Sequence, residues 1–248
     1  MRPLNPLTPL NPVKNAIESI AAIARQYCTC TAFGLISVVG LMAGCSAIDK
    51  PTRPSMYDFG PGLPTQSAAA ATPAAHTLPP MAIADISTAG GAIENQAVLY
   101  RLAYTDAQEL RPYSQARWSM PPAQLVNKRM RELLGQRRVV LTAREGIALN
   151  RSQNANLPML RVELEEFSHL FSAPDASVGL IRLHATLVDI TPQGEKLVAQ
   201  RSFALQRPAA SANAAGGVRA LSEATDAAID ELDAWLRTAP IPPPATAR

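Results

Sequence analysis

An uncharged stretch separates Arg25 from Asp49, and within it residues 32–43 are almost wholly apolar. A membrane-spanning helix needs roughly 20 apolar residues, whereas the core of a secretory signal needs about 7 to 15 behind a positively charged flank. The flank here is basic and includes Arg2 and Lys14. The pattern therefore predicts a secretory leader, and the folded part of the chain is expected to begin after it.

The apolar run ends in the sequence LMAGC, residues 41–45, where small residues precede a cysteine. This ending resembles a bacterial lipobox, although Met42 stands where leucine is usual. We therefore expect residues 1–44 to be removed as a lipoprotein signal peptide and Cys45 to carry palmitate and other acyl chains, which together hold a protein on a membrane essentially permanently. The alternative is an uncleaved anchor helix over residues 27–48, which the three glycines in that stretch disfavour.

The residue after the modified cysteine predicts which membrane holds the anchor. Ser46 occupies the position where aspartate would resemble the signal for retention in the inner membrane. We therefore expect the protein to lie on the outer membrane, facing the periplasm, rather than on the inner membrane.

Cysteine placement and charge limit the chemistry of the mature chain. Cys28 and Cys30 lie inside the predicted leader, and no cysteine follows Cys45. The mature protein is therefore expected to lack disulfides and cysteine-based metal or nucleophile chemistry. The basic leader supplies most of the formal net charge of +3, and a nearly neutral remainder argues against nucleic-acid binding.

Composition divides the remaining chain into a tether, one domain and a tail. Residues 45–56 are expected to form a lipidated tether, and residues 57–237 a single domain. Within that domain, residues 61–80 are rich in alanine and proline and carry no formal charge, which predicts a mobile loop. The proline-rich residues 238–248 are expected to form a disordered tail.

Hydrophobic periodicity predicts an α+β domain. Strands are expected at residues 56–60, 81–86, 97–103, 137–143, 159–167, 178–190 and 196–206. Helices are expected at residues 121–135 and 217–237. A hairpin is expected at residues 191–195, which contain proline and glycine. Because the strands alternate apolar and polar residues, we expect a largely antiparallel sheet with two main amphipathic helices packed on one face.

The last helix shows which side chains it should bury. One stripe holds the expected core residues Leu221, Thr225, Ala228, Leu232 and Trp235. The acidic residues Glu223, Asp226, Asp230 and Asp233 fall away from that stripe, so we expect all four to face water.

The sequence offers no convincing catalytic or metal site. His76 lies in the expected loop, whereas His169 and His184 lie in expected strands, and no GxSxG or HExxH motif gives any of them a partner. One expected strand carries the carboxylates Glu163, Glu165 and Glu166. A solvated strand face explains this cluster, so we expect no catalytic residue, no cofactor and no enzyme activity.

Three stretches together are similar to one known family. They are Tyr57-Asp58-Phe59-Gly60, the run from Val98 to Leu134, and AAIDELDAWL at residues 227–236. Over most of residues 45–237 the chain resembles the ABC-type transport auxiliary lipoproteins, the PqiC-like lipoproteins of MCE-type lipid transport systems. It departs from the family pattern in the long Ala/Pro-rich loop and in Phe59, where leucine is commoner.

The resemblance implies a non-catalytic lipoprotein that works beside an ATPase, a permease and an MCE-domain protein to move phospholipids between membranes. The expected role is to dock the transporter at the outer membrane, with phospholipid as a further candidate ligand. The alternative is a periplasmic lipid-binding chaperone lipoprotein that holds an acyl chain in its own groove.

The middle stretch contains the candidate partner-binding residues. They are Tyr113, Arg117, Trp118, Pro121 and Pro122, which we expect in a loop before the first helix. Large rings and a guanidinium group are favoured at interfaces. The alternative is structural: Trp118 packs under the helix that follows, and the two prolines set the angle at which that helix begins.

Overall fold

The computed structural model describes residues 53–62, 78–153, 156–191 and 194–240. The predicted signal peptide, Cys45, His76, and most of the predicted tether, Ala/Pro-rich loop and tail lie outside the described residues. Within these four ranges, no helix has both the length and the apolar character needed to cross a membrane.

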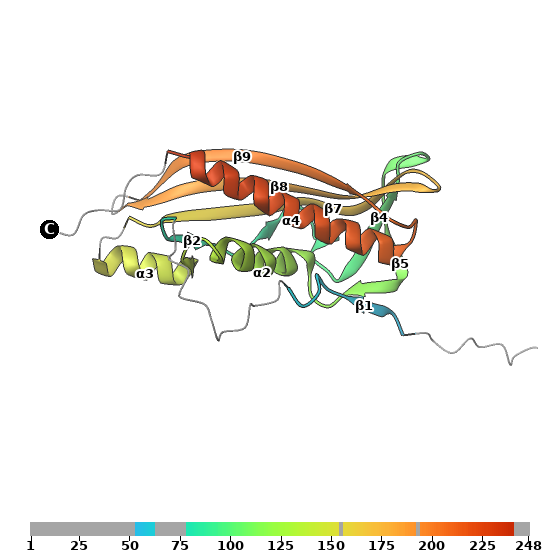
Figure 1. Ribbon diagram of the computed structural model, residues 1–248, viewed down its shortest axis with the longest axis horizontal. Coiled ribbons are helices and arrows are strands. Elements are labelled where there is room, and N and C mark those ends of the chain that lie inside the picture. The colour runs from blue at the N-terminus through green and yellow to red at the C-terminus, as the bar shows by residue number, and fades with distance from the viewer. Residues whose placement is uncertain (1–52, 63–77, 154–155, 192–193, 241–248) are drawn as a thin grey trace, which may run out of the picture. The chain divides into compact units, whose positions relative to one another are not determined.

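Three long strands form the largest part of the sheet. They are β7 (Pro158–Ala173), β8 (Ala176–Thr191) and β9 (Gly194–Pro208). All three pair antiparallel, with Leu164 opposite Leu183 and Leu183 opposite Phe203. These residues are buried, so the alternating apolar pattern forms one inner face. The predicted hairpin between the last two strands is confirmed (Figure 1).

Six shorter strands complete a nine-stranded sheet in the described part of the chain. They are β1 (Ser55–Tyr57), β2 (Met81–Ile83), β3 (Ser87–Thr88), β4 (Ala97–Leu102), β5 (Asp106–Trp118) and β6 (Val140–Thr142). A short 3-10 helix, Gly91–Ile93, precedes β4. Strands β2, β3 and β4 each run parallel to β7, β1 runs parallel to β5, and β6 runs parallel to β2.

The sheet is therefore mixed, and the expectation of a largely antiparallel sheet is wrong. Strand β5 and the two helices that follow it bring the chain back before β7 begins, so β4 and β7 run in the same direction. Alternation of apolar and polar residues reports which face of a strand is buried, and it carries no information about the direction of the neighbouring strand.

Both predicted helices are present, as α2 (Pro122–Gly135) and α4 (Ala214–Thr238). A third helix, α3 (Ala143–Gln153), was not expected, and the predicted strand at 137–143 shortens to β6. The reason is a reciprocal cap. Glu145 accepts hydrogen bonds from the backbone N–H and hydroxyl of Thr142, and the Thr142 hydroxyl accepts one from the Glu145 N–H. These bonds lower the pKa of Glu145.

The helices cover the sheet side by side. Helix α4 packs along β7, β8 and β9, and α2 packs against α4 (Figure 1), while α3 contacts β2 and β6. At Gly179 the backbone of β8 lies so close to the backbone of Ala220 in α4 that a Cβ atom at this position would overlap it. The buried stripe of α4 includes Leu221, Thr225, Ala228 and Leu232, as predicted, with Trp235 half-buried at its edge.

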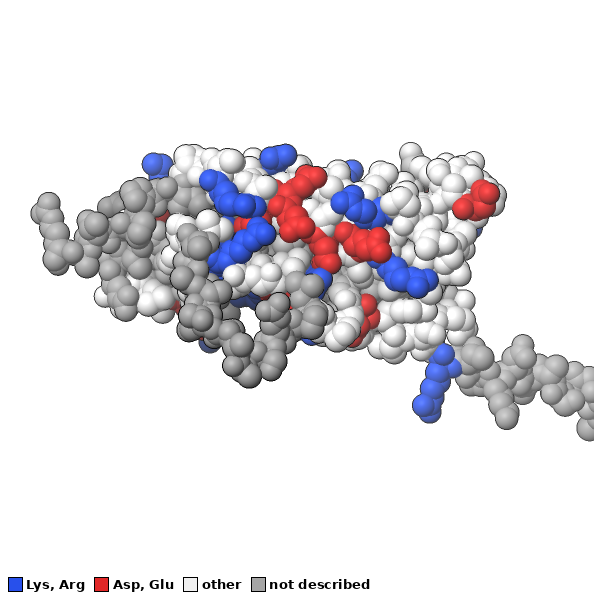
Figure 2. Space-filling view, viewed as in Figure 1, with Lys and Arg blue, Asp and Glu red and all other residues white. Residues whose placement is uncertain are grey.

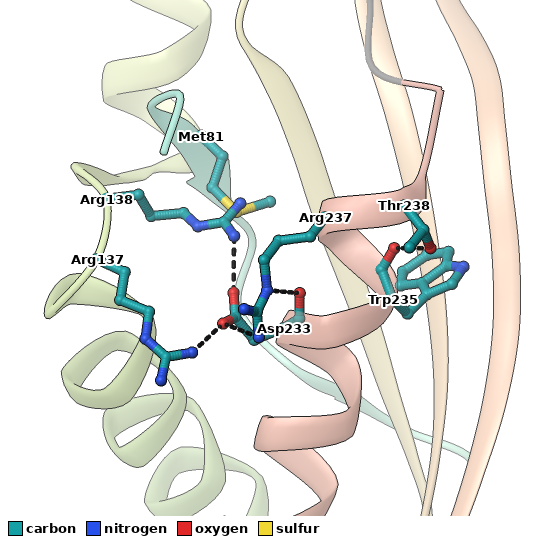
Figure 3. Close-up of polar contacts among 7 residues, drawn as sticks. All are labelled: Met81, Arg137, Arg138, Asp233, Trp235, Arg237 and Thr238. Atoms are coloured by element: carbon teal, nitrogen blue, oxygen red, sulfur yellow. Dashed lines mark hydrogen bonds and ion pairs between the residues drawn. The ribbon is translucent and has the colours of Figure 1, made fainter. Parts of the chain in front are cut away.

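Ion pairs join α2 and the segment after it to α4. Arg129 pairs with Asp226 through two hydrogen bonds of 2.6 and 2.7 Å. Further along, Arg137 and Arg138 both pair with Asp233 (Figure 3). The expectation that Asp233 faces water is therefore wrong. Its side chain is only 4% exposed, because the guanidinium of Arg138 lies buried against it.

Candidate functional site

The candidate partner-binding residues do not form a loop. Tyr113, Arg117 and Trp118 belong to β5, Pro121 caps α2, and Pro122 begins that helix. The expectation of a loop is wrong because this run has strand neighbours on both sides. Ala97 of β4 lies opposite Arg117, and Tyr57 of β1 lies opposite Trp118.

Trp118 fills the core at the end of β5. Its side chain is 0% exposed and meets Phe59 edge-on at 5.7 Å and Phe167 at 5.5 Å between ring centroids. Pro122 is also buried. Within the described structure these two side chains offer no surface to a partner, so only Tyr113, Arg117 and Pro121 are partly exposed members of the candidate set.

Arg117 donates hydrogen bonds to the backbone of its own strand, β5. Its Nη1 donates to the carbonyl oxygens of Tyr113 at 2.6 Å and Ala116 at 2.8 Å. The Tyr113 ring stacks at a tilt on Tyr100, with centroids 4.5 Å apart. These contacts order the end of β5, and a partner-binding role for the exposed members of the set stays a prediction.

A buried hydrogen-bond network lies behind Tyr113. The Tyr113 hydroxyl lies 2.9 Å from Nδ1 of His169, and Nε2 of His169 lies 2.8 Å from the Ser177 hydroxyl. His169 has no exposed surface, and Gly217 of α4 lies against its ring. Burial lowers the pKa of His169 to about 4 and raises the pKa of Tyr113. The network therefore ties β5 to β7 and β8 through neutral side chains.

Because His169 stays neutral when buried, stability should fall in acid. The unfolded chain takes up a proton near pH 6.5, whereas the folded chain resists protonation until about pH 4. Between those values the wild type should lose about 3 kcal/mol more unfolding free energy than His169→Gln. Urea denaturation of both proteins from pH 7.5 to 4 measures this difference, and parallel pH profiles would contradict it.

Three other titratable side chains singled out in the sequence have ordinary structural partners. His184 lies 3.0 Å from the Ser202 hydroxyl across the β8–β9 pair. Glu166 pairs with Arg101 at 3.0 Å, and Glu165 lies 3.6 Å from Arg182. In the described ranges, no three histidine, cysteine or acidic side chains gather as a metal site would require.

Two adjoining grooves run beside the start of α4. The larger, about 510 Å³, lies between Met56–Gly60 and residues of α4 that include Val218. The smaller, about 310 Å³, is lined by Tyr113 and the first residues of α4. Tyr57 and Ala215 line both grooves, and Met56 is 60% exposed. We call this surface the β1–α4 groove.

The β1–α4 groove was not predicted from the sequence, although one candidate partner-binding residue, Tyr113, lines it. Its walls come from β1 and α4, which are more than 150 positions apart in the chain. The one available signal was the small-residue run from Ala214 to Gly217, which allows close approach to the first turn of a helix.

The fold of this chain is similar to two solved structures, and its sequence matches one family. The solved structure of protein XCC0632 from Xanthomonas campestris is similar at 19% sequence identity and a TM-score of 0.52, over 66% of this chain and 86% of that one. An uncharacterized protein matches at 13% identity and a TM-score of 0.52, over 75% of this chain and 99% of its own. Both likenesses concern the fold alone. No curated protein sequence matches. A family model for the ABC-type transport auxiliary lipoprotein component matches residues 62–232.

Proposed function

The chain belongs to the ABC-type transport auxiliary lipoprotein family, and from this premise we propose that it serves an MCE/ABC-type intermembrane phospholipid transport system. In this role it is a lipid-anchored periplasmic accessory that docks the transporter at the outer membrane. The family match over residues 62–232 carries the proposal, because it spans nearly all of the folded domain.

The β1–α4 groove supports a docking role. It combines an exposed methionine, a half-buried tyrosine and the apolar Val218 with the charged rim residues Arg219 and Glu223. An apolar floor with a polar rim is the usual anatomy of a protein interface. The proposed occupant is the MCE-domain component, which connects this protein to the permease and ATPase.

Docking at the groove is tested by photo-crosslinking from Met56. A photoreactive amino acid at this position is expected to crosslink to the MCE-domain protein in cells. Leu197 on β9 provides a matched control, because it is 57% exposed against 60% for Met56 and lies outside the groove. Equal crosslinking from both positions, or none from Met56, would contradict docking at this surface.

Anchoring is tested separately at Cys45. The Cys45→Ala variant should lose palmitate incorporation, and it should no longer fractionate with outer membranes, where we expect the wild-type lipoprotein. Radiolabelling and density-gradient fractionation measure the two effects. Wild-type protein found with inner membranes would contradict the outer-membrane part of the proposal while leaving the lipid anchor intact.

A further inference from the structure

Three arginines surround one buried carboxylate where α2 and α4 end. Arg138 Nη2 lies 2.7 Å from one oxygen of Asp233, and Arg137 Nη1 lies 2.7 Å from the other. Arg237 Nη2 lies 3.1 Å from that second oxygen, and its Nε donates to the Asp233 carbonyl at 3.3 Å (Figure 3). We call these four residues the Asp233 cluster.

The Asp233 cluster holds more positive charge than its single carboxylate neutralises. Three guanidinium groups against one carboxylate leave two positive charges. The C-termini of α2 and α4 lie beside the cluster, and each contributes about half a negative charge. Roughly one positive charge therefore remains without a partner.

Neighbouring charges do not supply the missing negative charge. Asp226 and Glu132 both pair with Arg129. Arg131 donates to the carbonyl oxygens of Ile83 and Leu141, and its positive charge acts on Glu145 rather than on the cluster. Asp230 lies one turn before Asp233 on α4 and makes no ion pair in the described structure.

Two of the three guanidinium groups can still receive a ligand. Arg137 and Arg237 are 51% and 44% exposed, whereas Arg138 is 3% exposed. Within the described chain, Nε and Nη2 of Arg137 and Nη1 of Arg237 have no acceptor. Both arginines reach the same Asp233 oxygen, at 2.7 and 3.1 Å, so the two guanidinium groups meet at one atom. Acidic and basic side chains interleave across the α2 and α4 face, with basic side chains exposed there (Figure 2).

We propose that the Asp233 cluster binds the phosphate group of an anionic phospholipid headgroup through Arg137 and Arg237. A phosphodiester carries one negative charge, which matches the charge left over. Its two unesterified oxygens suit the paired N–H donors of guanidinium groups. The choice of a lipid as the source of the phosphate rests on the proposed transport function, whereas recognition of the phosphate rests on the cluster alone.

The test uses the full mature lipoprotein in detergent, titrated with water-soluble glycerophosphoglycerol as the headgroup probe. Replacing both exposed arginines (R137A/R237A) should weaken binding about tenfold or more. The matched control R144A/R151A also removes two positive charges, from exposed arginines of α3 that make no ion pair in the described residues, and should bind within about twofold of wild type. Equal weakening in both double variants would overturn the site.

Two further measurements distinguish a lipid from other anions. Phosphatidylglycerol should copurify with the wild type and the control, and should be lost from R137A/R237A in native mass spectrometry. Inorganic phosphate that binds without any copurifying lipid would overturn the lipid source. Tighter binding of hexaglutamate than of glycerophosphoglycerol would overturn phosphate recognition in favour of an acidic protein segment.

The variant R137K/R237K is a control for misfolding. It keeps both positive charges beside Asp233 and removes only the planar guanidinium groups. This variant should bind the headgroup probe at least twofold more weakly than wild type, and binding equal to wild type would overturn the paired-donor geometry. None of these measurements involves a transporter. A negative result here combined with crosslinking from Met56 would therefore remove this inference and leave the proposed docking function standing.

Discussion

Replacing Asp233 with alanine is expected to lower the free energy of unfolding by about 3–5 kcal/mol. The Asp233 carboxylate faces the buried guanidinium of Arg138 at 2.7 Å. Without it, a positive charge would stay buried beside two further arginines, in a place where burial already lowers the pKa of Arg138. Urea denaturation followed by tryptophan fluorescence measures the loss, since the chain contains two tryptophans.

Two variants separate this charge effect from a general effect of substitution on α4. Asp230→Ala removes an exposed carboxylate one turn earlier and should change stability by less than about 0.5 kcal/mol. Asp233→Leu combined with Arg138→Met removes both buried charges and should recover most of the lost stability. If Asp233→Ala costs no more than Asp230→Ala, Asp233 is not the buried partner of Arg138.

Trp118→Ala should be similarly damaging, with a loss of about 3–5 kcal/mol. The Trp118 ring is fully buried between Phe59 and Phe167, so its removal leaves a cavity where β5 leads into α2. Circular dichroism during thermal unfolding measures the loss without depending on the deleted fluorophore.

The comparison for Trp118 is Trp235, which is half-buried and packs edge-on against Phe203 at 5.9 Å. Trp235→Ala should cost about 1–2 kcal/mol, because part of its surface is already in water. The result also decides whether Trp118, as a candidate partner-binding residue, contacts a partner or packs under the helix. Unchanged stability of Trp118→Ala, with crosslinking from Met56 abolished, would show that Trp118 acts in docking rather than in packing.

The candidate site could be predicted from the sequence only in part. Tyr113, Arg117 and Trp118 were identified as a group, and the structure places all three in β5. What they do there depends on neighbours from other elements. Trp118 meets Phe59 and Phe167, and Tyr113 reaches His169, which lies 56 positions later in the chain. No local pattern in the sequence encodes those pairings.

The sequence contains a local signal for the start of helix α3, but a strand pattern directly before it competes with that signal. Thr142 and Glu145 have the spacing of a capping box, which marks the start of a helix. The apolar residues just before them also suit a strand, and their alternation predicts one over residues 137–143. The structure contains both, a short strand that ends where the cap begins.

The sequence by itself determined the elements whose polarity repeats over many residues, namely the β8–β9 hairpin, α2 and α4. Such periodicity is local, since it depends only on which side of an element meets water. Tertiary structure alone decided the direction of the strands beside β7, the burial of Trp118 and Asp233, and the gathering of three arginines around one carboxylate. Those features depend on which distant side chain fills or neutralises a given place, and only the folded chain brings those side chains together.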